Sequence, residues 1–98
     1  MKIEINKNGT ALTIIPEGRL DTITSPEFEN TVIENITGIT DLTFDLNKVV
    51  YLSSAGIRVF IRTQKIMLEQ GQMELVNVKK DIMEVFEMVG LTDVMTIR

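Results

Sequence analysis

Residues 51–60 of the chain read Tyr51-Leu52-Ser53-Ser54-Ala55-Gly56-Ile57-Arg58-Val59-Phe60. An apolar run typical of a strand ends here in small hydroxylated residues, and apolar residues at helical spacing follow. A serine at such a junction predicts a helix cap, because its hydroxyl accepts hydrogen bonds from backbone N–H groups that the first helical turn leaves free. A phosphate on either serine would lie at the positive end of the helix dipole. The pair is therefore a candidate switch as well as a cap, and the cap is the commoner role.

Strand and helix patterns alternate on both sides of this junction. Period-two alternation predicts strands over about residues 1–5, 10–15, 42–46 and 72–76. Asn8-Gly9 predicts a type I′ hairpin turn between the first two strands, and the second strand should end near Pro16 or carry it at an edge or bulge. Val49–Leu52 leads from the third strand to the serines, and Val94–Ile97 fits a weak final strand or a tail.

Three helices are expected. Thr24-Ser25-Pro26-Glu27 predicts the start of the first, with a hydroxyl cap, proline in the first turn and an acid near the positive pole. The second runs from about Ser54 to Gln70, and glycines at positions 38, 71 and 90 are the expected helix ends. The predicted buried faces consist of Phe28, Val32 and Ile36 with Ile33 beside them, then Ile57, Phe60, Ile61, Met67 and Leu68, then Ile82, Val85, Phe86 and Val89.

These elements predict an α/β fold with a mixed β-sheet and packed helices, in the order β-β-α-β-α-β-α with a weak final β. Alternating strands and helices imply right-handed crossovers between parallel neighbours, whereas the hairpin requires one antiparallel pair. A chain of 98 residues is expected to form a single domain over residues 1–98, because one core of this size does not subdivide.

Composition excludes most chemistry. The chain has no Cys, His or Trp, which removes thiol nucleophiles, histidine triads and the usual zinc ligand sets. A net charge of −4 argues against nucleic acid as a partner. No apolar run approaches the ~20 residues that cross a bilayer, and no glycine-rich phosphate loop is present. We expect a cytoplasmic protein that binds no membrane, holds no metal or other cofactor and is not an enzyme.

Acidic residues are the remaining candidates for catalysis. Asp21, Asp45 and Asp93 lie near predicted element ends, and Asp45 is the one that could approach the serines. An outward strand position or a turn acceptor is the favoured interpretation of Asp45. A small enzyme that uses two carboxylates stays open as a third class of function, although no spacing brings two acids together.

Four separated motifs resemble the STAS domain, which bacterial anti-sigma factor antagonists share with the tails of sulfate transporters. The resemblance spans essentially the whole chain and implies a mixed sheet with helices packed against it. The motifs are Gly18-Arg19-Leu20-Asp21, Thr24-Ser25-Pro26-Glu27-Phe28, Asp45-Leu46-Asn47-Lys48-Val49 and Leu52-Ser53-Ser54-Ala55-Gly56-Ile57.

The resemblance implies which residues act. In the antagonists, the functional serine opens the second helix within a pattern usually written Asp-Ser-Ser-Gly-Leu. This match places Ser54 on the phosphorylated serine and Asp21 on an acid that lies close to it. Position 53 carries serine in place of the aspartate, so Ser53 is an alternative target. The expected partner-binding residues are Asp21, Ser53, Ser54, Ala55, Gly56, Ile57 and Arg58.

The implied function is that of an anti-sigma factor antagonist. Unmodified, it would bind a partner that is both an anti-sigma factor and a serine-protein kinase, and so release a sigma factor. Phosphorylation at Ser54 would end this binding, and a phosphatase would reset it. The alternative is a STAS module of another regulatory or transport complex, without serine phosphorylation.

Overall fold

A computed structural model of the protein describes all residues 1–98 and begins with an antiparallel hairpin. β1 (Lys2–Asn8) pairs with β2 (Ala11–Leu20), with Asn8 opposite Ala11. The two turn residues are therefore Gly9 and Thr10, and only Gly9 has a positive φ, of 63°. The predicted type I′ turn at Asn8-Gly9 is wrong, because that turn needs positive φ at both central residues.

β2 is the strand that links the two parts of the sheet. β3 (Asp41–Asp45) and β4 (Val49–Leu52) pair with it in parallel, one after the other along its length. β5 (Gln72–Val76) lies parallel to β3, and β6 (Thr96–Ile97) lies parallel to β5. The mixed sheet is confirmed, in the order β1-β2-β3-β5-β6 with β4 beside β2. β4 is an additional strand, since only a lead-in to the serines was expected there.

Pro16 and Gly18 let β2 change partners. β2 continues past Pro16, which lies between the stretch that pairs with β3 and the stretch that pairs with β4. On the other side of β2, Pro16 lies opposite Ile3 of β1, so the proline is inside a paired strand. The register shifts next to Gly18, whose φ is 99°. The strand therefore does not end near Pro16, which lies at a gap in the pairing on this side of β2, and the irregularity is two residues further on, between Gly18 and Arg19.

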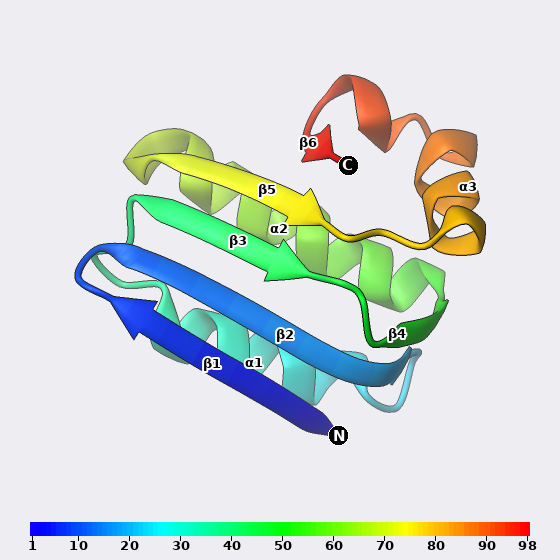
Figure 1. The fold of residues 1–98 in the computed structure, drawn as a ribbon, viewed down its shortest axis with the longest axis horizontal. Coiled ribbons are helices and arrows are strands. Elements are labelled where there is room, and N and C mark those ends of the chain that lie inside the picture. Colours follow the sequence, from blue (N-terminus) through cyan, green and yellow to red (C-terminus); the bar gives the residue numbers. More distant parts are fainter.

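Helices α1 (Ser25–Asn35) and α2 (Ser54–Gln70) cover one face of the sheet (Figure 1). α3 (Lys80–Met88) lies beyond the end of β5 and contacts β4, and a short 3-10 turn η1 (Leu91–Asp93) follows it. The predicted end of α2 is confirmed at Gly71, where a Cβ would collide with the carbonyl oxygen of Thr40. No helix combines the length and the apolar composition needed to cross a membrane.

The core lies between the sheet and the helices and contains 22 buried apolar side chains. Phe60 is at its centre, with ring centroids 5.6 Å from Phe28, 5.1 Å from Phe44 and 5.8 Å from Phe86, all edge to face. Three expected core residues are wrong. Ile33 is 46% exposed, because it lies one residue beyond buried Val32. Leu68 is 72% exposed, because it lies one residue beyond buried Met67 and so points away from the sheet. Val89, just after α3, is 51% exposed.

Candidate functional site

The loop after β2 and the start of α2 meet at one edge of the sheet. Arg19 lies opposite Tyr51 and Leu20 opposite Leu52 in the parallel pairing of β2 with β4. The backbone N–H of Ser53 continues this pairing by donating to the carbonyl oxygen of Leu20 at 2.9 Å. The chain therefore leaves the sheet at neighbouring points after Leu20 and after Leu52, and runs on from there to α1 and to α2 (Figure 1). The parallel pairing thus brings together the motif that ends at Asp21 and the motif that contains the serine pair.

Ser53 is the N-cap of α2. Its Oγ accepts a hydrogen bond from the backbone N–H of Ala55 at 3.2 Å, and its carbonyl oxygen accepts one from Ile57 at 3.0 Å. Its φ of −101° and ψ of 175° are the extended conformation that a cap requires. The predicted helix start is confirmed, and the hydroxyl of half-buried Ser53 is committed to the cap.

Ser54 is the first residue of α2 and is exposed. The first turn of α2 carries no acidic side chain, so nothing on the helix compensates its positive end. Arg58 lies one turn along the same face, is exposed and takes part in no ion pair. A negative charge at Ser54 would meet both the helix dipole and this guanidinium.

Gly56 and Ile57 hold the first turn of α2, and with it the serines, against the sheet and the core. Gly56 is buried, and a Cβ there would lie 2.9 Å from the Leu20 Cβ and 3.1 Å from the Leu20 carbonyl oxygen. Glycine is thus needed for the first turn of α2 to approach β2. Ile57 is 8% exposed and packs into the core. Of the expected partner-binding residues, Ser54 and Arg58 are the exposed ones on α2, and Ala55 is half-buried.

Asp21 organises the loop between β2 and α1. Its Oδ1 accepts hydrogen bonds at 3.0 Å from the backbone N–H groups of Ile23 and Thr24. The N–H of Thr24 lowers the pKa of the Asp21 carboxyl from its ordinary value, and the N–H of Ile23, the Thr24 hydroxyl and Arg19 act in the same direction. Partial desolvation opposes them. Asp21 is therefore an ionised loop anchor.

Thr24 does not cap α1 with its hydroxyl, so that prediction is wrong. The hydroxyl instead donates to the carbonyl oxygen of Arg19 at 2.6 Å and accepts from the N–H of Asp21 at 3.0 Å. The Thr24 hydroxyl thus bonds to the backbone of Arg19 and Asp21, although the local sequence pattern assigns it to the helix cap. Pro26 in the first turn of α1 is confirmed.

The other acids lie apart from this edge or in local turns. Asp45 accepts a hydrogen bond from the N–H of Asn47 at 3.0 Å, so its role as a turn acceptor is confirmed. Asp93 is exposed in η1. No group of three or more Asp or Glu side chains is placed to hold a metal ion.

An exposed apolar side chain, Ile23, is the surface feature that the motifs do not reveal. It is 85% exposed on the loop that Asp21 anchors. Val50 and Tyr51 of β4 are 57% and 41% exposed, and the Arg19 guanidinium lies 4.1 Å above the Tyr51 ring. An isoleucine between two threonines, outside any periodic pattern, is the sequence signal for such a residue.

Comparison with known proteins agrees with this fold. The sequence profile of the STAS domain matches residues 2–98. The anti-sigma-B factor antagonist of Listeria monocytogenes is 33% identical over 103 residues, which cover 100% of this chain and 89% of that protein.

Two solved structures share the architecture. A crystal structure of an anti-sigma factor antagonist from Mycobacterium paratuberculosis superimposes with a TM-score of 0.87, at 16% identity, over 98% of this chain and 83% of that chain. The Bacillus cell fate determinant SpoIIAA in its phosphorylated form gives a TM-score of 0.76, at 16% identity, over 99% and 91% of the two chains. With the profile match over nearly its whole length and the Listeria relative, the chain belongs to the STAS domain family.

Proposed function

We propose that this protein is an anti-sigma factor antagonist controlled by phosphorylation of Ser54. In its unmodified form it binds an anti-sigma factor that is also a serine kinase, and a sigma factor is released. The observation that carries the proposal is the exposed position of Ser54 at the start of α2, while Ser53 is held in the cap. The names of the Listeria and Mycobacterium proteins support the same function.

The phosphoryl transfer needs groups that the partner supplies. The Ser54 hydroxyl oxygen forms a bond to the γ-phosphorus of ATP, the bond from that phosphorus to the bridging oxygen breaks, and ADP leaves. The hydroxyl proton passes to a base of the kinase. The nucleotide is the kinase's, because this chain has no glycine-rich phosphate loop of its own.

The docking surface is formed by Ile23, Val50, Tyr51, Ser54 and Arg58, which are exposed on the two segments that meet at the sheet edge and on β4. Apolar side chains supply area that loses water on binding, as in the centre of most protein interfaces. Phosphorylation adds about −1.5 to −2 charges to this surface. A thousandfold loss of affinity takes about 4 kcal/mol, which one unpaired charge desolvated against the partner can supply.

The test is phosphorylation by the cognate kinase. The full chain is incubated with ATP and the histidine-kinase-like anti-sigma factor of its own genome. The intact mass is measured, and any added phosphate is then located by peptide mapping. We expect the mass of one phosphoryl group on Ser54, no gain for Ser54→Ala, and an unchanged gain for Ser53→Ala. Ser54→Ala should still bind the kinase. Modification of Ser53 alone would overturn the choice of residue.

The alternative, a STAS module of another regulatory or transport complex, has one specific point in its favour. Serine stands at position 53, where the antagonists' pattern has an acid. A wild-type chain that binds the kinase candidates but is never modified by them would favour this alternative and refute the switch.

A further inference from the structure

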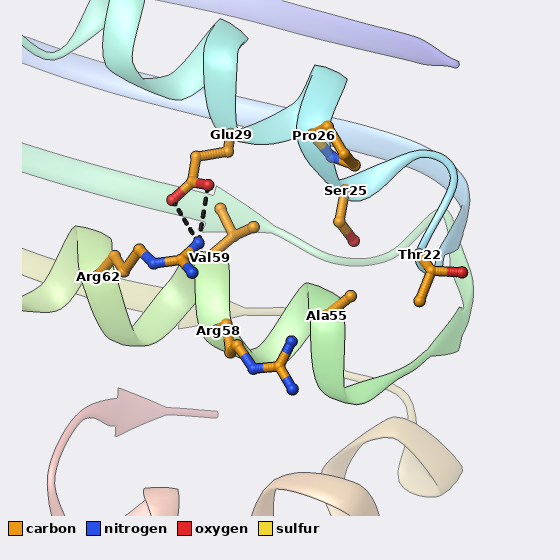
Figure 2. A pocket seen from close by; sticks show the side chains of 8 residues that line it. All are labelled: Thr22, Ser25, Pro26, Glu29, Ala55, Arg58, Val59 and Arg62. Carbon is orange, nitrogen blue, oxygen red and sulfur yellow. Dashed lines mark hydrogen bonds and ion pairs between the residues drawn. The ribbon is translucent and has the colours of Figure 1, made fainter.

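A groove lies between the N-terminal parts of α1 and α2 (Figure 2). Its volume is about 280 Å³, and its walls include Ser25 and Glu29 from α1 and Ala55, Arg58 and Arg62 from α2. None of these positions except Ala55 and Arg58 belongs to the proposed switch. The groove therefore has polar groups that the proposed switch does not use.

Ser25 presents an unsatisfied hydroxyl to this groove. The residue is 3% exposed, and its Oγ has no hydrogen-bond partner. Figure 2 shows the side chain directed from α1 toward Ala55 and Arg58 across the groove. The backbone N–H of Ser25 is already bonded to the Asp21 carbonyl oxygen at 2.9 Å, so the hydroxyl is not needed for the helix start. A buried hydroxyl without a partner is unfavourable unless a ligand or water completes it.

The groove is positive although the protein is acidic. Arg62 binds Glu29 through Nη1, at 2.8 Å and 3.0 Å from the two carboxylate oxygens (Figure 2). The charges of Arg62 and Glu29 cancel each other, whereas Arg58 has no ion-pair partner. Two arginines and one glutamate give the walls a net charge of +1, against −4 for the whole chain.

Two helix N-termini add to this positive potential. α1 begins at Ser25 and α2 at Ser54, and both first turns border the groove. The positive ends of two helix dipoles favour an anion at such a place. A guanidinium fork beside them suits the oxygens of a phosphate group better than a spherical halide.

We propose that this groove binds a phosphate group from solution, with Arg58 as its ion-pair partner and the Ser25 hydroxyl as a hydrogen-bond donor. The Arg62–Glu29 pair fixes the far wall and leaves Arg58 as the charge that selects the ligand. A small rotation of the Ser25 side chain brings its hydroxyl to the ligand. This inference does not rest on the proposed function, because it concerns the unmodified chain without a partner.

The test is titration of the ¹⁵N-labelled full chain with inorganic phosphate, against chloride at equal ionic strength. We expect saturable shifts of the Ser25 and Ala55 amide resonances with phosphate only. A second titration with O-phosphoserine separates the sources of the ligand: tighter binding means a phosphate carried on a larger molecule, and equal or weaker binding means the free ion. Absence of saturable shifts with both probes would overturn the proposal.

Variants identify the groups involved. Arg58→Ala should weaken binding at least about tenfold, and Arg58→Lys less, because lysine keeps the charge without the fork. Lys65→Ala is the matched control, since it removes one exposed positive charge of α2 outside the groove. Equal weakening by Lys65→Ala and Arg58→Ala would show only a response to net charge and refute the site. Ser25→Ala should still fold, because the substitution removes a buried hydroxyl that has no hydrogen-bond partner. It should bind phosphate more weakly, because the hydrogen-bond donor to the ligand is lost.

Discussion

Replacing Ser54 with aspartate puts a permanent negative charge at the start of α2 without any partner present. The helix dipole should favour this charge by about 0.3–1 kcal/mol, because the first turn has no other acid. Arg58, four residues on, should add about 0.2–0.5 kcal/mol in the favourable order of acid before base. Ser54→Asp should therefore raise the free energy of unfolding by about 0.5–1.5 kcal/mol.

This gain is small beside the total stability. A chain of 98 residues is expected to have about 5–15 kcal/mol, at roughly 0.05–0.15 kcal/mol per residue. In melting temperature the gain corresponds to a rise of roughly 2–12 °C. The charge should thus leave the fold as it is, and any large effect of phosphorylation on binding must arise at the interface with the partner.

The assay is urea and thermal unfolding of the full chain at low and high salt. Ser54→Asn is the neutral control and should stay within about 0.5 kcal/mol of the wild type. At about 1 M salt, where charges are screened beyond about 3 Å, most of the difference between Ser54→Asp and Ser54→Asn should disappear. A double-mutant cycle with Arg58→Ala should return a coupling of about 0.2–0.5 kcal/mol.

One result would refute this reasoning. If Ser54→Asp lowered stability by more than about 1 kcal/mol, or abolished cooperative unfolding, the charge would be perturbing the domain itself. The switch would then be a change of fold rather than a change of charge on an unchanged, exposed helix start.

Three further expectations follow from particular contacts. Ser53→Ala should lower the free energy of unfolding by about 1 kcal/mol, measured in urea, because it removes the cap of α2; an unchanged midpoint would deny the cap. Asp21→Asn keeps the acceptor oxygen of the loop but not its charge. Because the pKa of Asp21 is lowered in the folded state, the charge stabilises fully above the unfolded value of about 4 and is lost as pH falls through the lower folded pKa. The stability gap between wild type and Asp21→Asn should close over that acidic range, and a gap independent of pH would contradict the assignment. Phe60→Leu should cost about 1–3 kcal/mol more than Phe86→Leu in chemical unfolding, since Phe60 makes three edge-to-face contacts and Phe86 one; equal costs would show that the rings contribute by area alone.

Local periodicity was sufficient for the elements whose pattern is set by their own residues. The bounds predicted for α2 and β5 are those observed, because each is a regular amphipathic or alternating run closed by a capping residue or a glycine. Predictions failed where a segment distant in the sequence determines the pairing of a strand or the burial of a side chain. β4 exists because β2 extends past Pro16 to pair with it, and the exposure of Leu68 depends on how α2 is rotated against the sheet.

The chain by itself determined that a serine pair begins a helix, that the domain is α/β, and that catalysis by thiol or imidazole is impossible. These follow from spacing, capping chemistry and composition, which are local or global properties of the sequence. Only the tertiary structure decided that Ser53 is held in the cap while Ser54 is exposed, and that a positive groove opens between α1 and α2. Accessibility and potential arise from segments about thirty residues apart in the chain, brought together by strand pairing and core packing.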